Sequence, residues 1–267
     1  MTKIHLVGSE GFIGRAIQAA GKEVDLHCWS HRHSDLRHHF DLLDSSSWHT
    51  LLSHRPSHII LLSWPGLPNY AGLFHITRNL PACIDFINQL VASGLQRLVL
   101  TGTCYEYGLQ CGALSEIQLA DPVNCYSIAK DCLRRTISSK FEAKLTWCWA
   151  RIFYAYGAGQ NPNSLLSSLD LAIQTGQESF EMSSGRQLRD FIHVHEVAKH
   201  LLTLAVHQDA AGVYNVGTGI PRSVLEMAEE KIRSYDSNIV LNKGVYPDRP
   251  DEPLAFWAQI EKLESLY

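Results

Sequence analysis

A glycine-rich turn, Gly8-Ser9-Glu10-Gly11-Phe12-Ile13-Gly14, joins an apolar segment at 4–7 to a helix-forming segment at 12–20. Glycines spaced by three, directly between a buried strand and a helix, predict a dinucleotide-binding loop rather than an ordinary turn. The first glycine permits a tight turn, the second lets the backbone approach a pyrophosphate, and the third lets the helix pack against the strand. The helix N-terminus then faces the phosphates. The residues expected to contact the cofactor here are Gly8, Glu10, Gly11, Phe12, Ile13 and Gly14.

The rest of the first half alternates strand and helix. Apolar segments at 24–30, 58–64, 97–101 and 145–152 predict strands, and segments at 73–92 and 123–141 predict long helices. Apolar strands separated by helices predict a parallel sheet covered on both faces. Pro and Gly become denser after residue 156, where shorter elements replace the alternation. We therefore expect an α/β fold, with a Rossmann-like doubly wound parallel sheet at 1–156. A small C-terminal lobe should occupy most of 157–267, with segments at about 188–217 returning to the sheet.

Composition excludes several classes of function. The chain has 267 residues, 45% of them hydrophobic, and a net charge of −4. This charge argues against a nucleic-acid partner or a polybasic membrane patch, and no apolar run approaches the roughly 20 residues that span a bilayer. The N-terminus shows no signal-peptide cleavage pattern. Seven scattered cysteines without a Cys-x-x-Cys pair fit reduced thiols, so we expect a cytoplasmic protein. No ligand spacing accompanies the histidines at 31, 33, 38 and 39, so no metal site is expected.

The end of the second predicted strand indicates which cofactor fits. A site that selects NAD usually places an acidic side chain there for the ribose 2′-hydroxyl, whereas an arginine suits a 2′-phosphate. The predicted strand ends at Ser30, and Arg32 follows two residues later. The first acidic residue after the strand is Asp35. Ser30 and Arg32 therefore favour NADP(H), with NAD(H) as the alternative. Further along, Asp41 and Leu42 lie where a loop can reach the adenine.

Tyr126 and Lys130 are four residues apart at the start of the predicted helix at 123–141, so their side chains lie on one helix face. A phenol beside an ammonium is an acid/base device, because the cation favours the phenolate and lowers the pKa of the tyrosine. Alone, this spacing is a weak signal that any amphipathic helix can show. It gains weight here because the same chain carries the glycine loop.

Further motifs follow in order along nearly the whole chain. They are Thr103 with Tyr107-Gly108, Tyr126 with Lys130, and the segments at 151–157, 189–198, 214–219 and 249–251. Together with the glycine loop they resemble the extended short-chain dehydrogenase/reductase superfamily, specifically its NAD(P)-dependent nucleotide-sugar epimerase/dehydratase/reductase family. One such motif is a weak signal, whereas the ordered set is a strong one.

The resemblance implies a role for each site residue. Thr103 would bind the reacting oxygen of the substrate, Tyr126 would transfer its proton, and Lys130 would bond the nicotinamide ribose. The cofactor site would also include Leu62, Ser63, Tyr126 and Tyr154. The residues implied to contact a nucleotide sugar are Trp64, Thr103, Cys104, Tyr126, Tyr154, Arg189 and Arg249, with the two arginines as ligands of its diphosphate.

Departures from the family pattern narrow the expected reaction. Dehydratases of this family carry an acidic pair directly after the catalytic threonine, because loss of water needs an acid and a base. Cys104 and Tyr105 occupy those positions here, and Glu106 follows them, so we do not expect dehydration. The chain also ends soon after Arg249. By analogy, so small a lobe is more typical of 4-ketoreductases than of the longer epimerases.

The favoured function is reduction of the 4-keto group of a nucleoside-diphosphate 4-keto-6-deoxyhexose in deoxysugar biosynthesis. An NAD-dependent nucleotide-sugar 4-epimerase is the alternative. A non-catalytic dinucleotide-binding relative is less favoured, because Thr103, Tyr126 and Lys130 occur together. In relatives, the helices corresponding to 73–92 and 123–141 pair across a dimer axis, so the resemblance also implies a homodimer.

Overall fold

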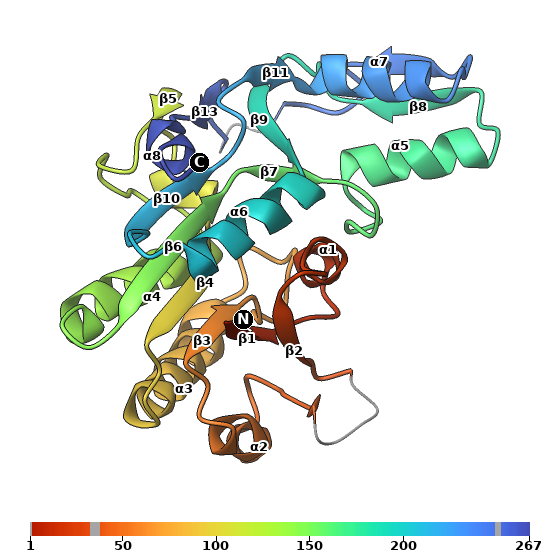
Figure 1. Cartoon of the computed structure of the whole chain (residues 1–267). Helices are drawn as coiled ribbons and strands as arrows, with labels where there is room; N and C mark the ends of the chain where they lie inside the picture. Colours follow the sequence, from red (N-terminus) through yellow and green to blue (C-terminus); the bar gives the residue numbers. More distant parts are fainter. Residues whose placement is uncertain (1, 33–37, 249–251) are drawn as a thin grey trace.

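A six-stranded parallel sheet forms the centre of the molecule (Figure 1). In spatial order its strands are β2 (Asp25–Trp29), β1 (Lys3–Val7), β3 (His58–Leu61), β4 (Arg97–Thr103), β6 (Thr146–Ile152) and β10 (Gly212–Val216). Each neighbouring pair is parallel. The structure is a computed structural model that describes residues 2–32, 38–248 and 252–267. It confirms the expected α/β fold with a doubly wound parallel sheet.

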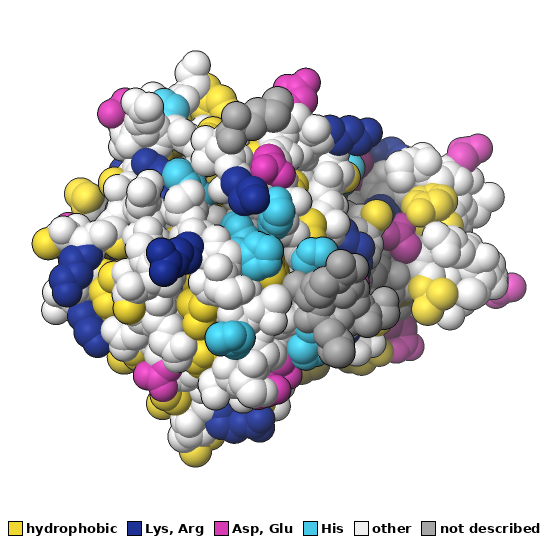
Figure 2. Space-filling view, turned by 60° about the horizontal axis from the view of Figure 1, so that its bottom comes forward, with side chains coloured by type: hydrophobic (Ala, Val, Ile, Leu, Met, Phe, Trp, Pro, Cys, Tyr) yellow, Lys and Arg dark blue, Asp and Glu magenta, His cyan; other side chains and the backbone are white. Residues whose placement is uncertain are grey.

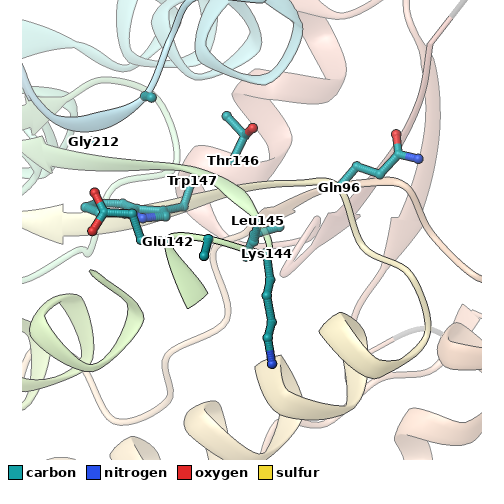
Figure 3. A pocket seen from close by; sticks show the side chains of 9 residues that line it. Gln96, Glu142, Lys144, Leu145, Thr146, Trp147 and Gly212 are labelled. Atoms are coloured by element: carbon teal, nitrogen blue, oxygen red, sulfur yellow. The ribbon is translucent and has the colours of Figure 1, made fainter. Parts of the chain in front are cut away.

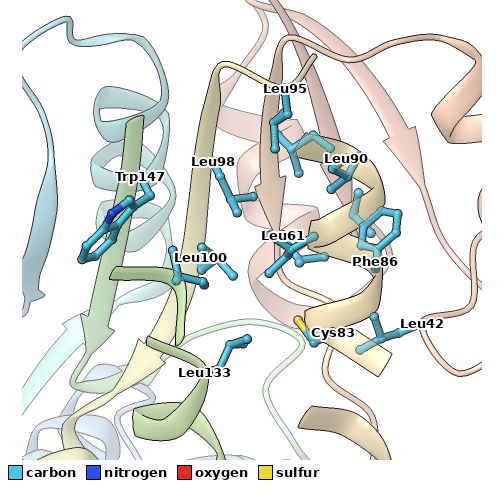
Figure 4. Close-up of a cluster of buried hydrophobic side chains, with 14 of the residues drawn as sticks. Leu42, Leu61, Cys83, Phe86, Leu90, Leu95, Leu98, Leu100, Leu133 and Trp147 are labelled. Atoms are coloured by element: carbon cyan, nitrogen blue, oxygen red, sulfur yellow. The ribbon is translucent and has the colours of Figure 1, made fainter. Parts of the chain in front are cut away.

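Helices cover both faces of this sheet. α1 (Phe12–Ala20) and α6 (Val194–Val206) pack together on one face, and α2 (Trp48–Ser53), α3 (Leu80–Ala92) and α4 (Cys125–Phe141) lie on the other (Figure 1). Side chains alternate between these faces along each strand. In β4, Leu98 and Leu100 therefore join the core beneath α3, while Val99 joins the core beneath α6. Figure 4 shows the first of these two cores, including Phe86 and Leu90 of α3.

Smaller elements of the second half form a lobe beside the carboxyl edge of the sheet. α5 (Leu165–Gln174) and α7 (Val224–Ser234) enclose a separate hydrophobic cluster with the paired strands β8 (Ser179–Met182) and β12 (Val240–Lys243). A three-stranded sheet of β7 (Tyr154–Tyr156), β9 (Leu188–His193) and β11 (Pro221–Ser223) connects this lobe to the main sheet. β13 (Phe256–Ala258) pairs with β5 (Gly112–Leu114), and α8 (Glu261–Glu264) follows it.

Most predicted elements lie within about two residues of their expected bounds, but two differ by more. The strand expected at 58–64 ends at Leu61, and residues 62–64 form a loop. The helix expected at 73–92 consists of a π-helical turn, η3 (His75–Asn79), followed by α3. The loop and the π-helical turn meet where Trp64 Nε1 donates to His75 Nδ1 at 3.0 Å. A local sequence pattern cannot show such a contact between two segments.

Across the described parts of the chain, the helices are all too short or too polar to cross a bilayer.

Candidate active site

The glycine loop lies at the carboxyl end of β1. Gly8 has a φ of +90°, and a Cβ at this position would lie 3.0 Å from the backbone nitrogen of Ser63. A Cβ on Gly14 would collide with the carbonyl oxygens of Gly8 and Ser9. α1 therefore starts close against the strand. Its N-cap residue, Gly11, has no side chain to cap the first backbone N–H groups of the helix. These N–H groups suit an anion such as a pyrophosphate.

Other predicted cofactor contacts border this loop. Leu62 and Ser63 follow β3 and lie against Gly8. Leu42 is buried in the core (Figure 4), a placement that does not favour direct contact of its side chain with an adenine. The Asp41 carboxylate accepts a backbone N–H of its own loop at 2.9 Å. Their roles at the cofactor remain predictions.

Opposite charges flank the end of β2, where the adenine ribose would lie. Ser30 is buried, and its hydroxyl donates to the Glu10 carboxylate at 3.3 Å. The backbone N–H of Arg32, an exposed residue, donates to Ser30 Oγ at 3.2 Å. Glu10 was predicted to contact the cofactor from the glycine loop, whereas in the structure its carboxylate lies beside Ser30 at the end of β2. A carboxylate accepts a hydrogen bond from a 2′-hydroxyl and repels a 2′-phosphate, so this placement of Glu10 does not favour the NADP(H) preference predicted from Ser30 and Arg32, which stays a prediction.

We expect Glu10→Gln to raise the ratio of kcat/KM for NADPH to kcat/KM for NADH about tenfold, because it removes a charge that repels the 2′-phosphate and keeps the side-chain shape. Steady-state kinetics with both cofactors measures this ratio. Glu10→Asp is the control, because it retains the negative charge. An unchanged ratio in Glu10→Gln would show that the carboxylate does not act on the ribose.

Thr103, Tyr126 and Lys130 converge at the carboxyl edge of the sheet. Thr103 ends β4, and Tyr126 and Lys130 lie in the first two turns of α4. The Thr103 side chain lies beside the Tyr126 phenol and influences its pKa. Lys130 Nζ donates to the Thr101 carbonyl oxygen at 2.9 Å and lies 5.8 Å from the Tyr126 ring centroid. The structure thus brings together the three residues predicted to be catalytic.

Burial governs the pKa values of this group. It raises the pKa of the Tyr126 phenol, and Tyr70 and Glu106 add to the effect, whereas the hydrogen bond with Thr103 opposes it. Burial also lowers the pKa of the Lys130 ammonium to about 8. The expected lowering of the Tyr126 pKa is therefore not found in this structure, because burial, the largest effect, raises that pKa and Lys130 is not among the groups that shift it most. A phenol that keeps its proton is suited to donate it.

Glu106 is held within the protein and does not face a reacting group. It is fully buried, and its carboxylate accepts the Thr103 backbone N–H at 2.9 Å, Trp149 Nε1 at 2.9 Å and Arg151 Nε at 2.8 Å. With Thr103 it forms a capping box around the short 3₁₀ helix η4 (Cys104–Tyr107). A carboxylate occupied by three donors is poorly placed to take a proton from a substrate. This agrees with the expectation that the chain does not dehydrate its substrate, which stays a prediction.

Aromatic side chains surround Tyr126. The rings of Trp64, Tyr70 and His75 have centroids 6.3, 5.6 and 5.3 Å from the Tyr126 centroid. The backbone carbonyl of Tyr70 also accepts the Tyr126 backbone N–H at 3.0 Å, and the Tyr70 ring packs edge-on against Tyr105. Trp64 was predicted as a substrate contact, whereas Tyr70 and His75 were not predicted. The prediction for Trp64 was the available signal, since it places a large aromatic ring beside Tyr126.

The predicted substrate residues further along the chain are mostly buried. The Arg189 guanidinium donates to the Tyr154 hydroxyl at 3.1 Å and to the Glu252 carboxylate at 2.9 Å, and the residue is 1% exposed. Its role as a diphosphate ligand stays a prediction that this placement does not favour. Cys104 is buried in an adjoining hydrophobic cluster. Arg249 lies outside the described residues.

A hollow of about 420 Å³ lies away from these residues, at the amino edge of the sheet (Figure 3). It is lined by the turns that precede β4, β6 and β10, including the exposed residues Glu142 and Lys144. The catalytic residues predicted at Thr103, Tyr126 and Lys130 lie toward the opposite, carboxyl edge. We assign this hollow no part in the proposed chemistry.

Histidine side chains gather on the face shown in Figure 2. His33, one of the histidines considered as metal ligands, lies outside the described residues. Among the residues that are described, no group of three His, Cys, Asp or Glu side chains is arranged to hold a metal ion.

Comparison with known proteins places this arrangement in a family. Residues 4–217 match the NAD dependent epimerase/dehydratase family. The dTDP-6-deoxy-L-talose 4-dehydrogenase (NAD(+)) of Aggregatibacter actinomycetemcomitans is 25% identical over 201 residues, which cover 74% of each chain.

Two solved structures share the fold at lower identity. UDP-N-acetylglucosamine 4-epimerase from Methanobrevibacter ruminantium M1, solved with UDP-N-acetylmuramic acid, has a TM-score of 0.86 and 22% identity, over 99% of this chain and 91% of that one. RMD from Pseudomonas aeruginosa, complexed with NADPH, has a TM-score of 0.85 and 20% identity, over 100% of this chain and 92% of that one. Because the family match spans most of the sequence, the chain belongs to the NAD dependent epimerase/dehydratase family, a group of nucleotide-sugar enzymes within the extended short-chain dehydrogenase/reductase superfamily.

Proposed function

We propose that this chain is an NAD(P)H-dependent reductase of the 4-keto group of a nucleoside-diphosphate 4-keto-6-deoxyhexose. NAD(P)H supplies the hydride when bound. The Thr103 hydroxyl donates a hydrogen bond to the keto oxygen, and the Tyr126 phenol protonates that oxygen as the carbon is reduced. Lys130 bonds the nicotinamide ribose and, as a cation, favours the phenolate that Tyr126 becomes.

The proposal is carried by the groups that surround Thr103. Reduction of a ketone needs one proton donor and one group that binds the oxygen, and the Tyr126 phenol and the Thr103 hydroxyl can supply them. Dehydration would need a further acid and base. The nearest carboxylate, Glu106, is occupied by the backbone of Thr103 and by buried donors. The raised pKa of Tyr126 keeps its phenol protonated, as the reduction direction requires.

The relative named as a dTDP-6-deoxy-L-talose 4-dehydrogenase supports the same proposed function. Its name gives it as a 4-dehydrogenase of a 6-deoxy sugar nucleotide, and the reverse of that reaction is reduction of a 4-keto group. A 4-epimerase is the second candidate, because the Glu10 carboxylate beside Ser30 favours NAD, the cofactor that an epimerase retains. A homodimer through the helices at about 73–92 and 123–141 and a cytoplasmic location remain parts of the proposal.

The purified protein is expected to consume NADPH or NADH when supplied with a 4-keto-6-deoxyhexose nucleotide, because Tyr126 and Thr103 can complete the reduction. A panel of dTDP, GDP, CDP and UDP substrates, followed by loss of reduced-cofactor absorbance and by NMR of the product, measures this. Thr103→Val is the matched variant, since it keeps the side-chain shape and removes the hydroxyl. Its turnover should fall about 10²–10³-fold.

Two results would contradict the reductase. Tightly bound NAD, with interconversion of two C4 epimers and no net use of added NAD(P)H, would establish the epimerase in its place. A panel in which no sugar nucleotide binds or reacts would overturn both candidates.

A further inference from the structure

We propose that Trp64 is a positioning residue that keeps the Lys130 ammonium charged and in place through a cation–π contact. The inference rests on the proton-transfer role given to Tyr126 and Lys130 in the proposed function. It assigns Trp64 to the catalytic lysine, where sequence analysis assigned it to the substrate.

The Lys130 ammonium lies over the face of the Trp64 indole, with Nζ 4.1 Å from the ring centroid. A cation within about 6 Å of an indole face is attracted by the negative charge of that face, and the attraction is larger where water is excluded. Both residues are buried, Lys130 being 4% and Trp64 8% exposed. The only hydrogen bond that Nζ forms within the described residues goes to the Thr101 carbonyl oxygen. The indole face is therefore a main contact of the ammonium.

Trp64 is itself fixed in orientation. Its Nε1 donates to His75 Nδ1 at 3.0 Å, which leaves His75 Nε2 to donate to the Asn69 carbonyl oxygen at 2.7 Å. The Trp64 and His75 rings lie nearly parallel, at 15°. The Asn79 amide donates to the Pro65 carbonyl oxygen at 2.8 Å and holds the next residue of the loop. These contacts aim the indole face at the ammonium.

Few negatively charged groups near Lys130 compete with the Trp64 indole to stabilise the ammonium. The Cys83 thiol is buried, which raises its pKa to about 12 and keeps it neutral. Burial raises the pKa of Tyr126 and lowers the pKa of His75, so both are neutral near pH 7. Glu106 stabilises the cation electrostatically, but its carboxylate is hydrogen-bonded elsewhere. The contribution of the indole should consequently be measurable.

Burial lowers the pKa of Lys130 to about 8, so a modest change in the stability of the cation alters its charge near working pH. The ammonium is the protonated form, so activity that needs it is present below this pKa and is lost as pH rises through it. A weaker cation–π contact destabilises the cation, lowers the pKa further and moves the loss of activity to lower pH.

Site-specific replacement of Trp64 by tryptophans with increasing ring fluorination tests this. Fluorine weakens the negative ring face while nearly keeping the size and the N–H donor. With the benzo ring fully fluorinated, we expect the acid dissociation constant of Lys130 to rise about tenfold. NMR of ¹³C-labelled lysine Cε measures the titration without substrate or cofactor, and Lys130→Met assigns the signal. The pH at which kcat is lost should fall in parallel.

Trp48 provides the matched control. It is also buried, its Nε1 donates to the Asp41 carbonyl oxygen at 2.8 Å, and no described lysine or arginine lies over its ring. Fluorination there should leave the Lys130 titration unchanged. An unchanged titration on fluorination of Trp64 would overturn the inference. A shifted titration in a protein that turns over no keto sugar would support the contact and contradict the proposed function instead.

Discussion

Tyr126→Phe is expected to lower turnover about 10²–10⁴-fold and to leave cofactor affinity nearly unchanged. The substitution removes the hydroxyl that gives the proton but keeps the buried ring. That ring packs against Trp64, Tyr70 and His75, so the site should keep its shape. Steady-state kinetics measures the loss, and calorimetric titration with NADPH and NADH measures the affinity.

Tyr105→Phe is the matched control for this substitution. Its phenol is directed to another part of the site, where its hydroxyl lies 3.3 Å from the Tyr154 hydroxyl. We expect its turnover to remain within a few-fold of the native value. If Tyr126→Phe retains full activity, or if the two variants lose activity equally, Tyr126 is not the proton donor.

Local sequence signals were sufficient for the sheet and the glycine turn. The strand, the glycine turn from Gly8 to Gly14 and the helix α1 are consecutive, so their order and spacing show how they meet. The spacing of Tyr126 and Lys130 is equally local, because one helix carries both. Thr103 came from the resemblance to a family, since nothing in its neighbours alone marks a catalytic hydroxyl.

Contacts between distant segments were not predictable from these patterns. Glu10 reaches Ser30 across the loop, and Lys130 lies on Trp64 from a different part of the chain. Such partners depend on packing, which sequence periodicity does not record. Arg189 is a further example. Its place in a family motif predicts a phosphate ligand, but the sequence does not show that it is buried and paired with Glu252.

Glu106→Ala is expected to lower the free energy of unfolding strongly, because the carboxylate of Glu106 is buried with its partners. Its partner Arg151 is 1% exposed, and the side chains meet with Arg151 Nε 2.8 Å from the carboxylate. Glu106→Ala would leave this guanidinium buried without its counter-ion, and would also remove the acceptor for Trp149 Nε1. Breaking a buried pair by removing one partner costs about 3–5 kcal/mol of the free energy of unfolding.

Urea unfolding measures this loss as a fall in the midpoint concentration, provided that the slope is unchanged. Glu106→Gln should lose less, because an amide oxygen still accepts a hydrogen bond. Glu196→Ala is the surface control. Glu196 is paired with Lys199 at 2.7 Å but half-exposed, so its loss should change stability by no more than about 1 kcal/mol. If Glu106→Ala and Glu196→Ala destabilise the protein equally, the carboxylate of Glu106 does not organise the interior beneath Thr103.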